Sequence, residues 1–137
     1  MSRLATLAAL LAERPGLDAL RSEGDLLTLS AAPAAVPALA ESLTKEHGFE
    51  FATLLVEDLD HGLTVHYAFF HPSDHVRVSI GAYVNGELAT ISDRIHAADW
   101  YEREAEDLFG VHFSGHPFLG DFILHDDCWP EAVAPMR

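Results

Sequence analysis

Residues 76–91 read Val-Arg-Val-Ser-Ile-Gly-Ala-Tyr-Val-Asn-Gly-Glu-Leu-Ala-Thr-Ile, and this stretch decides the fold class. Apolar side chains alternate over residues 76–84, which is the period-two pattern of a strand with one buried face. Asn85-Gly86 is the dipeptide most typical of a two-residue hairpin turn. The stretch therefore predicts an antiparallel hairpin whose returning strand spans residues 87–91.

The segments around this hairpin add strands and helices. Further strands are predicted over residues 25–30, 49–58 and 63–70. Helices are predicted over residues 4–13, from Pro33 or Pro37 to just before Gly48, and over residues 97–109. In the last helix, Tyr101, Ala105, Leu108 and Phe109 form the expected core stripe, and Asp93 or the loop after it is the expected cap. Together these elements predict an α+β fold: a mostly antiparallel sheet of about four strands with helices on one face.

The end of the chain has a different character. Residues 1–110 are predicted to form the α+β domain, and residues 111–137 an extended C-terminal docking tail of the same unit. The tail places Phe113, Phe118, Phe122 and Trp129 among glycines, prolines and aspartates, without a lasting period. Because disordered linkers are poor in large aromatic residues, we expect the tail to lie along a protein surface.

Composition excludes several kinds of partner. The 137 residues include 22 acidic and 8 basic ones, for a formal net charge of -14. This charge disfavours binding to nucleic acid and to anionic membrane surfaces, and it favours a basic partner, although an acid excess also serves solubility alone. The single cysteine, Cys128, permits no internal disulfide and no cysteine-ligated cluster. No apolar run approaches the roughly 20 residues that cross a bilayer.

No constellation of residues predicts chemistry of the chain's own. The carboxylates of Glu102, Glu104, Glu106 and Asp107 share one helix, so they cannot flank a substrate from two directions. The densest group of metal-ligating residues lies in the tail; it comprises His112, His116, His125, Asp126, Asp127 and Cys128. None of its pairs has i, i+4 geometry on a predicted helix, because His112 and His116, although four apart, lie in a glycine-containing loop sequence. We therefore predict no catalytic, cofactor-binding or metal-binding residues.

One motif carries a family resemblance. Trp100-Tyr-Glu-Arg-Glu-Ala-Glu-Asp-Leu-Phe-Gly110 is followed by Val111-His-Phe-Ser-Gly-His-Pro117. This resembles the signature of the thirty-kilodalton subunit of complex I, the respiratory NADH–quinone oxidoreductase. That signature reads Trp, one residue, Glu-Arg-Glu, two residues, Asp-Leu-Phe-Gly-Ile, one residue, Phe, one residue, Gly-His-Pro.

The resemblance implies a role in respiratory-chain electron transport without a cofactor. It implies an accessory subunit of the peripheral arm that packs against the large, hydrogenase-like subunit, which helps to form the quinone site, and against other peripheral-arm subunits. The expected location is cytoplasmic, at the inner face of the cell membrane and held there only through partners. The motif residues would be structural and interfacial: Trp100, Glu102, Arg103, Glu104, Asp107, Gly110, His116 and Pro117.

Two departures from the family pattern leave other functions open. Gly120-Asp121 stands where the family usually has arginines, and the basic segment that usually follows is not matched before Arg137. The alternatives are a subunit of a membrane-bound energy-converting hydrogenase, a paralogue that has lost its complex, and a free-standing metal-binding protein that uses the histidine–aspartate tail.

Arg103 is the one motif residue for which the sequence predicts a specific contact. It stands between two glutamates in an acid-rich segment, so an ion pair with Asp107 or another carboxylate is expected. Neighbouring Trp100 and Tyr101 favour partial burial, because aromatic faces attract guanidinium groups.

Overall fold

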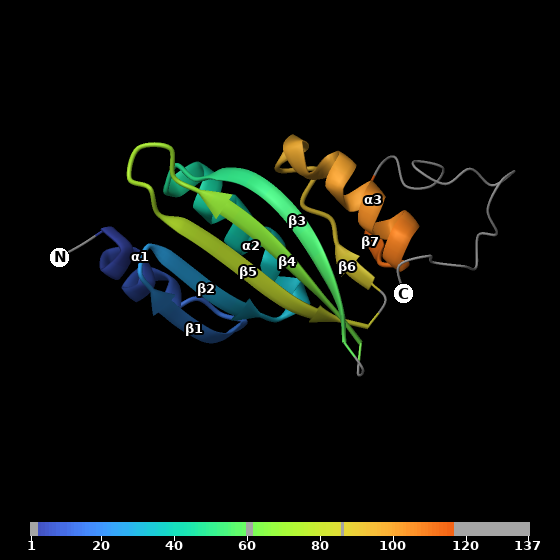
Figure 1. Cartoon of the computed structure of the whole chain (residues 1–137), viewed down its shortest axis with the longest axis horizontal. Helices are drawn as coiled ribbons and strands as arrows, with labels where there is room; N and C mark the ends of the chain where they lie inside the picture. The colour runs from blue at the N-terminus through green and yellow to red at the C-terminus, as the bar shows by residue number, and fades with distance from the viewer. Residues whose placement is uncertain (1–2, 60–61, 86, 117–137) are drawn as a thin grey trace, which may run out of the picture.

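The computed structural model describes residues 3–59, 62–85 and 87–116, and five strands form its main sheet (Figure 1). The strands are β1 (Leu17–Glu23), β2 (Leu26–Ala31), β3 (Glu50–Leu59), β4 (Gly62–Phe70) and β5 (Arg77–Val84), in the order β1-β2-β5-β4-β3. Neighbours pair antiparallel except β2 and β5, which pair in parallel. The predicted α+β class and mostly antiparallel sheet are confirmed, with five strands in place of four.

The core lies against one face of this sheet. Register places Leu29 opposite Ile80 and Ile80 opposite Tyr67, so inward side chains of three adjacent strands form a continuous apolar row. The helices α1 (Arg3–Ala12), α2 (Val36–Glu41) and α3 (Asp99–Phe109) contribute to the same core, α2 behind the sheet and α3 at the end near β3 (Figure 1). The opposite sheet face carries polar and small residues such as Thr64 and Gly81.

Prolines position the second helical segment as predicted. Pro33 opens a 3-10 turn, Pro33–Ala35, and Pro37 lies in the first turn of α2, where its missing N–H has no helical partner to lose. The segment continues as a π-helical turn, Ser42–Glu46, and then reaches Gly48, whose φ of 74° reverses the chain toward β3.

The predicted hairpin after β5 is wrong. The returning strand β6 (Glu87–Ala89) pairs in parallel with β7 (His112–Ser114), and the two make a separate small sheet with Leu88 opposite Phe113. The reason is that β5 already pairs with β4 on one edge and β2 on the other, so no edge remains for β6. The alternating pattern and the Asn-Gly turn are local signals, and they carry no information about β2.

Helix α3 matches its predicted core stripe only in part: Ala105 is buried and Phe109 packs against the core. Its buried residues are Asp99, Glu102 and Ala105, whereas Tyr101 is 39% exposed and packs its ring edge-on against Phe51 at 5.5 Å. No side chain caps the start of the helix, so Asp93 is wrong as the cap. The loop after Asp93, the other predicted alternative, leads into the helix through a 3-10 turn, His96–Ala98. The helix ends at Gly110 in the left-handed conformation, as a C-terminal cap requires.

The first residues of the predicted tail belong to the core. Val111 and Phe113 have no exposed surface. The rest of the tail, residues 117–137, lies outside the described residues, so its extended form stays a prediction.

Candidate functional site

Helix α3 carries a carboxylate into the core. Glu102 is completely buried, and its Oε2 accepts a hydrogen bond from the backbone N–H of Ile91 at 3.0 Å. Its Oε1 is hydrogen-bonded to the hydroxyl of Thr90. Both partners follow β6, where the chain passes against α3. A carboxylate buried at this depth is tolerated only with such partners, so these bonds fix the helix to the end of β6.

A second hydroxyl extends this contact. Thr90 Oγ1 and Ser92 Oγ are 2.7 Å apart, and either one can donate. The backbone N–H of Ser92 also donates to Thr90 Oγ1, at 3.1 Å. Glu102, Thr90 and Ser92 therefore form a continuous hydrogen-bonded chain.

A histidine that follows β7, His116, also contacts α3. Gly115, with a φ of 84°, turns the chain after β7, and the His116 side chain is fully buried against the first turn of α3. His116 Nε2 lies 2.9 Å from Asp99 Oδ1 and donates a 3.3 Å hydrogen bond to the Asp99 backbone carbonyl. The same nitrogen is 3.9 Å from Glu102 Oε1. We call Thr90, Ser92, Asp99, Glu102 and His116 the polar cluster.

Burial dominates the electrostatics of this site. It raises the pKa of the Glu102 carboxyl, and the hydrogen bonds from Thr90, Ile91 and Ser92, with the charge of His116, offset part of that effect. Burial and then the negative charge of Glu102 raise the pKa of Tyr67 well above its usual value. Among the described residues, the buried Tyr67 hydroxyl has no hydrogen-bond partner.

The family motif divides between this cluster and the outside of α3. Glu102 and His116 are buried, while Trp100 is 67% exposed and Glu104 is exposed. Arg103 and Asp107 are half-buried, so the predicted partial burial of Arg103 is confirmed. The predicted ion pair of Arg103 with a carboxylate stays a prediction. Gly110 caps the helix, and Pro117 lies outside the described residues.

Three members of the polar cluster were missed from the sequence: Thr90, Ser92 and Asp99. The available signal was a pair of hydroxyl residues two apart at the end of an apolar strand, facing a helix with several acids. The helix sequence alone predicts that one of its charges points inward, but it does not identify Glu102 as that charge.

The part of the chain that the structure describes contains no candidate metal-binding site. No group of three or more histidine, cysteine, aspartate or glutamate side chains within it could hold a metal ion. Of the tail residues considered for metal binding, His116 contacts Asp99 and His112 is exposed. The others, residues 125–128, lie outside the described residues.

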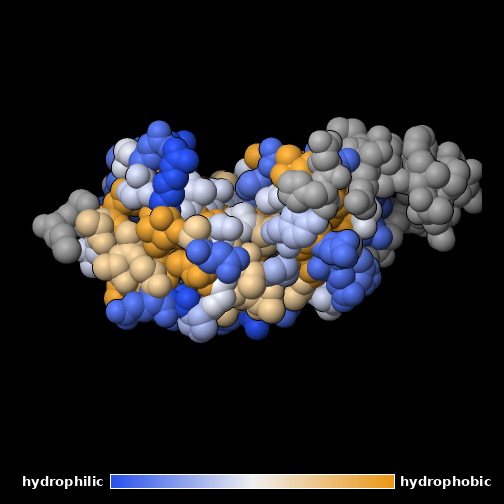
Figure 2. All heavy atoms as spheres, turned by 90° about the horizontal axis from the view of Figure 1, so that it is seen from below, coloured by the Kyte–Doolittle hydropathy of each residue, from blue (hydrophilic) through white to orange (hydrophobic). Residues whose placement is uncertain are grey.

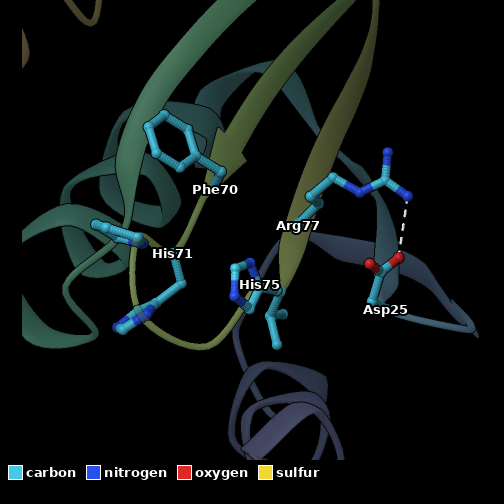
Figure 3. Close-up of a pocket in the computed structure, with 7 residues that line it drawn as sticks. Asp25, Phe70, His71, His75 and Arg77 are labelled. Atoms are coloured by element: carbon cyan, nitrogen blue, oxygen red, sulfur yellow. Dashed lines mark hydrogen bonds and ion pairs between the residues drawn. The ribbon is translucent and has the colours of Figure 1, made fainter.

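A surface hollow of about 420 Å³ lies beside the loop between β4 and β5 (Figure 3). At its rim, Arg77 and Asp25 form a 3.0 Å ion pair across β5 and the turn before β2. His71 Nδ1 accepts the backbone N–H groups of Ser73 and Asp74, so this nitrogen is used to hold the loop. Asp25, His71 and Arg77 of the hollow thus serve local structure.

The chain matches one family over most of its length. The family described as "Respiratory-chain NADH dehydrogenase, 30 Kd subunit" matches residues 29–137. An NADH-quinone oxidoreductase subunit of Rhodobacter capsulatus is 32% identical over 131 residues, which are 85% of this chain and 64% of that protein. Hydrogenase-4 component G of Escherichia coli K12 is 29% identical over 143 residues, which cover 97% of this chain and 25% of that protein.

A solved structure shows the same fold. It is that of the membrane-bound sulfane sulfur reductase, an archaeal respiratory membrane complex, with a TM-score of 0.80 over 96% of this chain and 81% of the matched chain, at 18% identity. No helix in residues 3–59, 62–85 and 87–116 is long and apolar enough to cross a membrane. The chain spans less than two-thirds of both curated relatives described above. Since the family match covers residues 29–137, the chain belongs to the family of the 30 kDa subunit of the respiratory-chain NADH dehydrogenase.

Proposed function

We propose that this chain is a non-catalytic docking subunit in the peripheral arm of a complex I-like NADH–quinone oxidoreductase, where it packs against the hydrogenase-like large subunit. The observation that carries the proposal is the division of the family motif. Its buried half, with Glu102 and His116, builds the core, and its outer half leaves Trp100 and Glu104 at the surface. The exposed Trp100, at 67%, leaves a large aromatic side chain available to a partner.

The outer side of α3 has the chemistry of a contact surface. Tryptophan is enriched among residues that dominate binding energy, because it buries a large area with few rotatable bonds. Glu104, Glu106 and Asp107 add negative charge on the same helix, which favours a partner with a basic surface. Figure 2 shows hydrophilic residues toward the end with α3, and apolar residues bordered by hydrophilic ones toward the end with α1 and β1.

The location is part of the same proposal. We infer a position at the cytoplasmic face of the cell membrane, reached through the large subunit and other peripheral-arm subunits. The membership of the chain in a respiratory-chain family supports this. The electron-transfer groups would belong to the partners.

A hydrogenase-type complex is the second candidate. The relative named hydrogenase-4 component G covers 97% of this chain, so the same docking surface suits a large subunit of that class. The two candidates share the docking role and differ in the partner.

Co-purification from native membranes tests the proposal. A tagged chain should retain a large subunit, which mass spectrometry identifies as the NADH dehydrogenase or the hydrogenase type. Trp100→Ala should lose this subunit and keep its thermal unfolding midpoint. The matched control is Tyr83→Ala, which removes an aromatic that is 46% exposed on the far face of the sheet and should keep the partner.

Two results would contradict the docking role. One is full retention of the large subunit by Trp100→Ala. The other is a chain that carries stoichiometric metal and co-purifies with no subunit of either complex, which would favour the metal-binding alternative.

A further inference from the structure

The polar cluster places two carboxyl groups beside one imidazole in the core. The titratable and charged groups that face this site, among the described residues, come from three parts of the chain. They are Tyr67 of β4, Asp99 and Glu102 of α3 with half-buried Arg103 next to them, and His116 after β7. An ionised Glu102 would place a negative charge where there is little water to solvate it.

The hydrogen-bonded series Glu102–Thr90–Ser92 can accept a proton without a change in backbone conformation. With Glu102 ionised, the Thr90 hydroxyl donates to Oε1, and the Ser92 hydroxyl donates to Thr90 Oγ1. With Glu102 protonated, its Oε1–H donates to Thr90 Oγ1, and the Thr90 hydroxyl then donates to Ser92 Oγ. Thr90 Oγ1 accepts two hydrogen bonds in both arrangements, because the Ser92 N–H donates to it throughout.

The remaining contacts of the carboxyl suit both states. Oε2 accepts the Ile91 N–H at 3.0 Å whether or not Oε1 carries a proton. All three residues of the hydrogen-bonded chain are buried: Glu102 has no exposed surface, Thr90 is 5% exposed and Ser92 is 9% exposed.

We propose that Glu102 is a buried proton-binding site, with Thr90 and Ser92 as its reversible hydrogen-bond partners and the Asp99–His116 contact beside it. The ligand is a proton taken from solvent water, and the carboxylate becomes a carboxylic acid in a single binding step. The cost of burying an ionised carboxylate favours the protonated form of Glu102, and the hydrogen bonds from Thr90 and Ile91 offset part of that preference.

The neighbouring histidine lies close to this proton site. His116 Nε2 is 3.9 Å from Glu102 Oε1, so loss of the proton from Glu102 adds a negative charge beside the imidazole ring.

Infrared spectroscopy of the full chain tests the site directly. The wild-type chain should show a protonated-carboxyl C=O stretch at pH values where ordinary glutamates are ionised. Glu102→Gln should abolish this band, because the amide resembles the protonated side chain in shape and cannot titrate. Glu104→Gln, an exposed position on the same helix, should leave the band unchanged. Persistence of the band in Glu102→Gln, or its absence from wild type above the ordinary glutamate range, would overturn the proposal.

A second variant tests the hydroxyl chain and does not depend on the first. Thr90→Val keeps the size of the side chain and removes the donor to the ionised carboxylate, so the infrared midpoint should move to higher pH. Thr90→Ser should return it toward the wild-type value. An unchanged midpoint in a folded Thr90→Val chain would refute the role of the hydroxyl, and carboxyl NMR of labelled glutamate gives the same comparison.

Discussion

At the scale of the residue, Glu102 couples folding to pH. Burial raises its pKa in the folded chain above the usual value of 4.5, so the folded chain holds the proton more tightly than the unfolded chain. This contribution to stability is fully present below the unfolded pKa and is lost as pH rises through the folded pKa. We expect the free energy of unfolding of wild type, minus that of Glu102→Gln, to fall across that window. Urea unfolding of both chains at a series of pH values measures this difference in free energy. A difference that does not change with pH would contradict the prediction.

Arg103 provides a second prediction at this scale. Its side chain is half-buried and its Nε has almost no exposed surface, so we expect Arg103→Met to cost about 1–3 kcal/mol, between the ranges for exposed and buried ion pairs. Arg21→Met is the control, because Arg21 pairs with Glu23 at 3.0 Å where the side chains are 76% and 72% exposed. That loss should be about 0–1 kcal/mol. Denaturant unfolding measures the loss of stability in both variants. Equal losses would mean that Arg103 contributes no more to stability than an exposed arginine.

At the scale of the element, β7 joins the small sheet to the core. Phe113 has no exposed surface and lies opposite Leu88 in the parallel pair. Phe113→Ala should therefore cost about 3–5 kcal/mol, since a large buried ring leaves a cavity. His112→Ala changes an exposed side chain on the same strand and should stay within about 0.5 kcal/mol of wild type. A loss under about 1 kcal/mol for Phe113→Ala would show that β7 is not part of the cooperative fold.

The elements also show how far sequence patterns reach. Strong alternation predicted β4 and β5, and helical spacing with prolines and glycines predicted α1, α2 and α3. Strand β1 was missed because Leu17 and Leu20 are only half-buried at a sheet edge, which leaves no clean alternation. The polar cluster was missed in part because its members come from the ends of β6 and β7 and from α3, and only the tertiary fold brings these together.

At the scale of the whole molecule, the net charge of -14 opposes compaction and favours a basic partner. Added salt shortens the Debye length from about 30 Å at 0.01 M to about 3 Å at 1 M. We therefore expect the thermal unfolding midpoint of the isolated chain to rise with NaCl, and its binding to the large subunit to weaken. Calorimetry and salt-dependent co-purification check the two effects. A midpoint that falls with NaCl would mean that attractive ion pairs outweigh the repulsion.

The parallel pairing of β2 with β5 sets the order in which the sheet can assemble. The chain between these strands contains α2, β3 and β4, so a ribosome must release all of them before β2 meets its partner. The antiparallel ladders of β3 with β4 and of β4 with β5 join neighbours in the chain, and they close short loops. Contacts between segments that are distant in sequence slow folding, because the chain loses the entropy of closing a long loop before the contacts stabilise it. We therefore expect the β1–β2 hairpin to join a preformed β3–β4–β5 meander, and this late step to limit the rate at which the nascent chain reaches its native state.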